Sequence, residues 1–240
     1  MTKSVKNQPF ENKLLNHNLS DKSLIIFDWD GTLMDSIGLI VTAMHVAAGA
    51  QGLKTTDDEV KAIIGLSLMR GIEILFPDIT DEQRQILQTD YADYYIANSH
   101  KTPFFPGIES MLEMLLAQGK QLAVATGKKR AGLDRVLTAS RSRDYFVSTR
   151  CADESGSKPD PQMLLDVLQE TGHSIADAVF IGDSIHDIQM AKALDMTSIA
   201  VNYGAATAAV LAAENPTYQL ASPQELIDLL TNTSSITATQ

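Results

Sequence analysis

The chain has few of the residues that crosslink secreted proteins or attract nucleic acids. Its 240 residues include one cysteine, Cys151, which excludes an intramolecular disulfide framework. We expect Cys151 to be a small, partly buried residue rather than a catalytic thiol. Lysine and arginine number 19 against 30 aspartate and glutamate residues, so the net charge is −11. This acidic balance argues against a nucleic-acid partner and against a membrane partner with an anionic surface.

Long apolar runs are also absent. No run approaches the roughly 20 residues that a membrane span requires, and residues 1–22 lack the apolar stretch of a signal peptide. Without a disulfide framework, a reducing and therefore cytoplasmic location is the simplest expectation. The remaining composition is 44% hydrophobic and 20% charged, which suits one large domain or one domain with a small insert.

Strand-like apolar runs alternate with helical patterns along most of the chain. This alternation predicts an α/β fold, in which a doubly wound parallel sheet carries helices on both faces. The predicted strands cover residues 24–28, 122–125, 146–149, 178–182 and 197–201.

Between residues 36 and 104 the alternation stops and only helical periodicity occurs. Asp35 or Ser36 is expected to cap the first of these helices. The predicted helices cover residues 37–50, 57–64, 67–75 and 81–98. We interpret the segment as a helical cap domain whose linkers, around 33–36 and 102–107, act as hinges of a lid.

This insertion divides the chain into four parts. The α/β core is expected to consist of residues 21–35 and 105–231, with the cap at 36–104 between them. Residues 1–20 are polar and are expected to form a loose arm, and residues 232–240 a frayed tail.

Two carboxylates stand directly after the first predicted strand. Asp28 and Asp30 are two residues apart and therefore point to roughly the same side, and Gly31 supplies a turn. Like charges this close repel unless a cation or a shared proton relieves them. The pair therefore indicates a metal site, an acid/base pair or both, with an ordinary acidic turn as the alternative.

Three further polar clusters follow in order. They are Thr126-Gly127-Lys128, Lys158-Pro159-Asp160-Pro161 and Gly182-Asp183-Ser184-Ile185-His186-Asp187. With the Asp28–Thr32 cluster, they resemble the four motifs of the haloacid dehalogenase-like superfamily, in the right order and spacing. Within it the chain looks most like the phosphoglycolate phosphatase-like branch with a helical cap. This resemblance implies a Rossmann-like core with strand order 5-4-1-2-3.

The resemblance also implies roles for the catalytic residues. Asp28 is the expected nucleophile, because a carboxylate can attack a phosphoryl group and divide one difficult displacement into two easier steps. Asp30 is the expected general acid/base. Lys158 would neutralise charge at the reacting phosphate, and Thr126 and Gly127 would hold its oxygens.

The metal expected from the resemblance is Mg²⁺, which prefers carboxylate oxygens and substrate phosphate as ligands. Its ligands would be the side chains of Asp28, Asp183 and Asp187 and the backbone carbonyl of Asp30. The alternatives for Asp187 are that it acts through water, that it positions Lys158, or that it serves only as an N-terminal helix charge.

Other polar or aromatic residues near these motifs receive simpler interpretations. Lys128 is expected to be mostly a solvated residue at the start of a helix, and His186 a solvent-facing loop residue. Trp29 is expected to pack between core and cap, and His45 to be structural. Arg70, in a turn between cap helices, is expected either to bind a substrate carboxylate or second phosphate, or to be an ordinary surface residue.

Taken together, these features predict a phosphoric monoester hydrolase acting on a small phosphorylated metabolite, with phosphoglycolate as the first candidate by resemblance. A phosphomutase of the same fold acting on a sugar phosphate is one alternative, and a non-catalytic binding module is another. The oligomeric state is expected to be a monomer or a homodimer.

Overall fold

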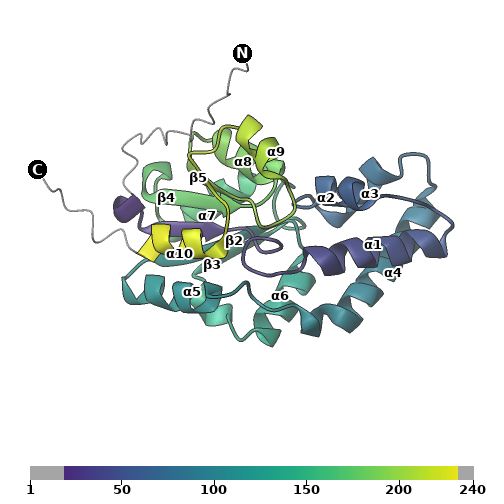
Figure 1. Ribbon diagram of the computed structural model, residues 1–240, viewed down its shortest axis with the longest axis horizontal. Coiled ribbons are helices and arrows are strands. Elements are labelled where there is room, and N and C mark those ends of the chain that lie inside the picture. The colour runs from purple at the N-terminus through teal and green to yellow at the C-terminus, as the bar shows by residue number, and fades with distance from the viewer. Residues whose placement is uncertain (1–18, 232–240) are drawn as a thin grey trace, which may run out of the picture.

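The computed structural model describes residues 19–231. Figure 1 shows a core of strands and helices on one side and the helices α1 to α4 projecting from it on the other. The tail expected at 232–240 and residues 1–18 of the expected arm lie outside the described residues. Leu19, the first described residue, is buried in the core and begins the short 3-10 helix η1 (Leu19–Asp21).

Six parallel strands form one sheet in the order β3-β2-β1-β4-β5-β6. Their bounds are β1 (Leu24–Phe27), β2 (Gln121–Thr126), β3 (Ser148–Cys151), β4 (Ala178–Gly182), β5 (Thr197–Val201) and β6 (Tyr218–Leu220). The order confirms the predicted 5-4-1-2-3 arrangement and the doubly wound parallel class.

Two strands differ from the prediction. The strand predicted at 146–149 begins two residues later, because Phe146 packs edge-on against Trp29 instead of joining the sheet. Strand β6 was not predicted, since its three residues are only partly buried and carry no apolar run.

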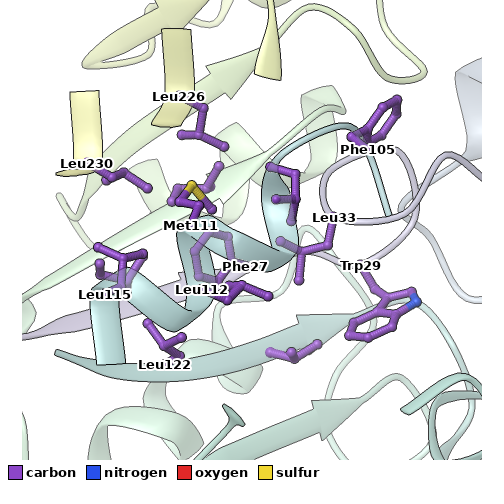
Figure 2. Close-up of a cluster of buried hydrophobic side chains, with 14 of the residues drawn as sticks. Phe27, Trp29, Leu33, Phe105, Met111, Leu112, Leu115, Leu122, Leu226 and Leu230 are labelled. Carbon is purple, nitrogen blue, oxygen red and sulfur yellow. The ribbon is translucent and has the colours of Figure 1, made fainter. Parts of the chain in front are cut away.

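Helices cover both faces of this sheet. Their bounds in the core are α5 (Ile108–Ala117), α6 (Arg130–Ala139), α7 (Gln162–Thr171), α8 (Ile185–Lys192), α9 (Ala208–Ala213) and α10 (Pro223–Thr231). Alternate residues of β1 point to opposite faces, so Ile25 and Phe27 pack with α5 and α10, whereas Leu24 and Ile26 pack with α7. Figure 2 shows Phe27 against Met111 and Leu112 of α5.

The cap helices are α1 (Ile37–Ala50), α2 (Asp57–Ile63), α3 (Leu68–Leu75) and α4 (Asp81–Asn98). These bounds confirm the four predicted helices to within one residue at each end. They enclose a hydrophobic cluster of their own, in which Met44, Val60, Ile72 and Leu87 are fully buried. Two of the helices begin with capping boxes, at Thr56 and at Thr80.

The prediction that Asp35 or Ser36 caps helix α1 was wrong for Ser36. Ser36 occupies the position before the helix, but its hydroxyl makes no capping bond. It donates instead to the carboxylate of Asp30, at 2.6 Å. Within residues 19–231, no helix has the length and the apolar character needed to cross a membrane.

Candidate active site

The polar residues of all four motifs meet at the carboxyl ends of the central strands. Asp28 directly follows β1 and Asp183 directly follows β4, and these two strands are hydrogen-bonded neighbours. Thr126 ends β2 on the other side of β1. All three side chains are buried. This edge is where open parallel sheets place their ligands, because the strand ends and the loops that follow them form a crevice there.

Lys158 lies between two of the buried carboxylates. Its Nζ is 2.7 Å from Asp28 Oδ1 and 2.7 Å from Asp187 Oδ1, and the three side chains have almost no exposed surface. Asp187 stands in the first turn of α8, where its second oxygen accepts from the backbone N–H and the hydroxyl of Ser184. Asp187 therefore combines two of the roles considered for it, the helix-terminal charge and the partner of Lys158.

Asp183 is enclosed by backbone on two sides. Its Oδ2 accepts from the N–H of Ala205 at 2.6 Å, and its Oδ1 accepts from the Thr32 hydroxyl at 3.1 Å. A β-carbon at Gly31 or at Gly204 would overlap this carboxylate. Gly31 also has a φ of +77°, which favours glycine, so the turn after Asp30 needs glycine for two separate reasons.

Burial sets the charge state of these groups. It raises the pKa of Asp28 to about 7, with Lys158 opposing this and Asp187 adding to it. Burial also raises the pKa of Asp183 well above its usual value, and the nearby Asp28 and Asp187 raise it further. For Lys158, burial acts to lower the pKa, but the two adjacent carboxylates outweigh it and raise the pKa above its usual value. The site holds more negative charge than one lysine neutralises.

The same residues fit a divalent cation. Carboxylate oxygens of Asp28, Asp183 and Asp187 lie within 4.8 Å of one another, and all three residues are buried. Oδ2 of Asp28 has no hydrogen-bond donor, and Oδ1 faces only the Lys158 ammonium. Buried carboxylates without donors are costly unless an ion accompanies them, and hard oxygen ligands of this kind suit cations such as Mg²⁺. These three carboxylates are the side-chain ligands predicted for the metal. The fourth predicted ligand, the backbone carbonyl of Asp30, remains a prediction.

Asp30 points away from this cluster and toward the cap. Its Oδ2 is 2.8 Å from Lys128 Nζ, and the Tyr95 hydroxyl of α4 lies 3.0 Å from the same nitrogen. The Lys128 ammonium also lies 4.5 Å from the centre of the Tyr95 ring. The prediction that Lys128 is mostly solvated was wrong, since its side chain is 11% exposed and paired with a carboxylate.

The cap turn at residues 65–67 lies against the predicted phosphate-binding residues. A β-carbon at Gly127 would overlap the carbonyls of Gly65 and Leu66, so only glycine allows this approach. The backbone N–H of Ser67 donates to the Ser157 hydroxyl at 3.0 Å, which ties the same turn to the loop that carries Lys158.

A second contact with the cap corrects the interpretation of His186. This residue lies in the first turn of α8 rather than in a loop, and its Nε2 is 3.2 Å from the carbonyl oxygen of Ala62 in the cap. Burial lowers its pKa below the usual value.

A cavity of about 470 Å³ lies between the cap and the core. Asp28, Asp30, Thr126 and Gly127 line it from the core side, so the predicted catalytic and phosphate-binding residues share one space. Arg70 is not among its lining residues, since it is exposed on α3 and paired with Glu73 at 3.0 Å. Its predicted contact with substrate has no support from this position.

The remaining predicted residues have structural positions. Trp29 is fully buried in the core and packs edge-on against Phe104 of the return linker and Phe146, rather than against cap helices. His45 joins α1 to Asp57 of α2, as expected of a structural residue. Cys151 is completely buried, and burial raises the pKa of its thiol to about 12.

The sequence profile of the haloacid dehalogenase-like hydrolases matches residues 25–201, which include all four clusters. The chain belongs to this family. The match confirms the resemblance on which the site residues were assigned.

Similar proteins from several bacteria extend this result. A protein named "Probable phosphatase IndB" from Dickeya dadantii is 33% identical, over 81% of this chain and 87% of its own length. A "Phosphoglycolate phosphatase" from Psychrobacter arcticus is 29% identical, over 88% and 96% respectively. The solved structure of a hydrolase from Pseudomonas syringae aligns with a TM-score of 0.80 at 26% identity, over 90% of this chain and all of that one. These relatives support the predicted enzyme class, a phosphoric monoester hydrolase.

Proposed function

We propose that this protein is a Mg²⁺-dependent phosphatase that hydrolyses a small phosphorylated metabolite through an aspartyl-phosphate on Asp28. The observation that carries the proposal is the state of Asp28. Its carboxylate is buried, with Lys158 at Oδ1 and no hydrogen-bond donor at Oδ2, yet it lines the cavity between core and cap. A nucleophile held in this way is desolvated but accessible to a phosphate ester.

The reaction consists of two displacements. In the first, a carboxylate oxygen of Asp28 forms a bond to phosphorus, the ester P–O bond breaks, and Asp30 gives a proton to the departing alkoxide oxygen. In the second, Asp30 takes a proton from a water molecule, whose oxygen attacks the same phosphorus and breaks the Asp28–phosphate bond. Asp30 thereby regains its proton, and inorganic phosphate is released.

The other site residues hold charge in place. Lys158 would reduce the repulsion between Asp28 and the incoming phosphoryl group, and Thr126 with the backbone at Gly127 would bind its oxygens. Asp28, Asp183 and Asp187 would hold Mg²⁺, the last also positioning Lys158. When bound, Mg²⁺ supplies positive charge that stabilises the phosphoryl oxygens in the transition state.

The test measures inorganic phosphate released from a panel of phosphate monoesters, with Mg²⁺ and with EDTA. Phosphoglycolate belongs in the panel because it appears in the names of several relatives. Asp28→Asn is expected to lose at least about a thousandfold in rate. Asp35→Asn is the matched control, because Asp35 is an exposed carboxylate at the end of the same loop.

Three results would count against the proposal. They are release that is unaffected by EDTA, release that survives Asp28→Asn, and no release from any ester by folded, metal-binding protein. Slow hydrolysis that a sugar bisphosphate accelerates would instead indicate the alternative phosphomutase.

A further inference from the structure

The cavity has two chemically different sides. The core side carries the charged and hydroxyl groups of the proposed reaction. The cap side is mostly hydrocarbon, and it includes residues from α1, the end of α2, α3, α4 and the segment that joins α2 to α3. Its uncharged polar residues are Ser67, Gln85, Gln88 and Thr89. The apolar residues on this side are Ile40, Met44, Ile63, Ile64, Leu66, Leu68, Tyr91, Ala92, Tyr95 and Ile96.

Among the described residues, the cap places no lysine, arginine or histidine on this cavity. Arg70 is paired with Glu73 outside it, and His45 is paired with Asp57. The charged cap residue that does line the cavity is Asp93, an acid. A carboxylate or second phosphate held on the cap side would therefore meet uncharged hydroxyl and amide groups but no cation of the cap, and burying an anion without an opposite charge is costly.

The cations that line the cavity all come from the core. Lys128 is already paired with Asp30. Lys129 and Arg135 belong to the start and the middle of α6, and Lys129 is exposed to solvent. A second anionic group of the substrate would therefore find cations only on the core side of the cavity.

Two tyrosines of α4 form an aromatic wall. The rings of Tyr91 and Tyr95 stack with their centres 6.0 Å apart and an interplanar angle of 18°. The Tyr95 hydroxyl is bound to Lys128, whereas burial raises the pKa of the Tyr91 hydroxyl far above its usual value. Both tyrosines line the cavity, so the stacked pair adds aromatic surface to its cap side.

We propose that the substrate is the phosphate monoester of an uncharged, largely apolar alcohol about as large as an aromatic ring. This inference rests on the proposed function and specifies the leaving group of that reaction. The cavity volume agrees with this proposal. Its 470 Å³ lies in the range of pockets that enclose drug-sized ligands, and it greatly exceeds the space that a two-carbon acid occupies.

The test compares three alkyl esters with Mg²⁺ present: benzyl phosphate, methyl phosphate and phosphoglycolate. All three release an alkoxide, so differences report mainly on binding of the leaving group. We expect kcat/KM for benzyl phosphate to exceed each of the other two by at least about tenfold. Calorimetry with benzylphosphonate and methylphosphonate, which cannot be hydrolysed, should give the same ranking of affinities.

Variants of Tyr91 provide the matched control. Tyr91→Ala should raise KM for benzyl phosphate about tenfold while leaving KM for methyl phosphate unchanged, and Tyr91→Phe should behave like the parent enzyme because the ring remains. A higher kcat/KM for phosphoglycolate than for benzyl phosphate would overturn the inference, as would equal effects of Tyr91→Ala on KM for benzyl phosphate and for methyl phosphate. If hydrolysis of all esters is absent, the proposed function itself fails.

Discussion

Lys158 is the residue on which the charge balance of the site depends. It is the cation within 2.7 Å of both Asp28 and Asp187, and all three side chains are inaccessible to solvent. Removing one partner of a buried ion pair is far more damaging than removing a surface charge, because the remaining charge stays buried and unpaired.

Lys158→Met is therefore expected to lower the free energy of unfolding by about 3–5 kcal/mol in the absence of metal. Urea unfolding followed by circular dichroism measures this change. Lys54→Met is the control, since Lys54 is exposed on the cap and should change stability by less than about 0.5 kcal/mol. Equal stabilities of the two variants would contradict the buried ion-pair network.

Lys128 and Lys129 are adjacent lysines in very different surroundings. The first is 11% exposed and bound to Asp30 and Tyr95, and the second is exposed. Lys128→Met should lower kcat/KM by about 10- to 100-fold, because the proposed general acid loses the cation that orients it. Lys129→Met should change kcat/KM by less than about threefold. Steady-state kinetics on a phosphate ester tests the pair, and similar losses in both variants would exclude a special role for Lys128.

At the scale of elements, the turn between α2 and α3 carries the contact of the cap with the phosphate-binding residues. Its carbonyls at Gly65 and Leu66 approach Gly127 so closely that a side chain there has no space. We expect Gly127→Ala to lower kcat/KM by about 10- to 100-fold, because a small displacement of the turn disturbs the geometry of the bound substrate.

The matched control for this substitution is Gly38→Ala. Gly38 lies in α1, and an added β-carbon there would meet no atom within 4 Å. It should keep full activity and gain slightly in stability. Thermal unfolding of Gly127→Ala checks that the core remains folded, and unchanged kinetics in this variant would show that the turn does not position substrate.

The elements that the sequence predicted well are those with local signals. The cap helices were located to within one residue, because the apolar residues between positions 36 and 104 repeat with a helical period. Thr56 and Thr80, which open capping boxes, were local signals that the prediction did not use. Strand β6 has turn signals on both sides, Asn215-Pro216 and Ser222-Pro223, but no apolar run between them, so only its pairing with β5 revealed it.

Side-chain contacts between residues that are far apart in the chain could not be predicted from the sequence. Asp28, Lys158 and Asp183 could be named as candidates because each stands in a recognisable motif. Tyr95 lies in an ordinary helical pattern, and nothing local indicates that its hydroxyl meets Lys128, 33 residues away. The error over Lys128 has the same origin, since its solvation depends on how α4 packs over the core.

For the whole molecule, the important feature is the placement of buried acids inside an already acidic chain. The net charge is −11, and the side chains of Asp28 and Asp183 have almost no exposed surface. Burial raises the pKa of both groups, so the folded state binds protons more tightly than the unfolded state does. Stability and metal binding are therefore linked through pH.

The sign of this linkage follows from the raised pKa values. The contribution of Asp28 to stability is fully present below its unfolded pKa of about 4, decreases as the pH rises, and is lost above its folded pKa of about 7. A bound divalent cation would pair with the ionised carboxylates and restore the stability that their ionisation removes. The rise in Tm on adding Mg²⁺ should therefore be small at pH 5 and larger at pH 8, where the ligands are ionised.

Differential scanning fluorimetry in Mg²⁺ and in EDTA across this pH range measures the effect. The control is Asp183→Asn, which removes one buried negative charge and one proposed ligand. It should make the metal-free protein more stable than the parent at pH 8 and abolish most of the Mg²⁺-dependent rise in Tm. A Mg²⁺ effect that is equal at both pH values, or that survives in Asp183→Asn, would contradict the link between these buried acids and the metal.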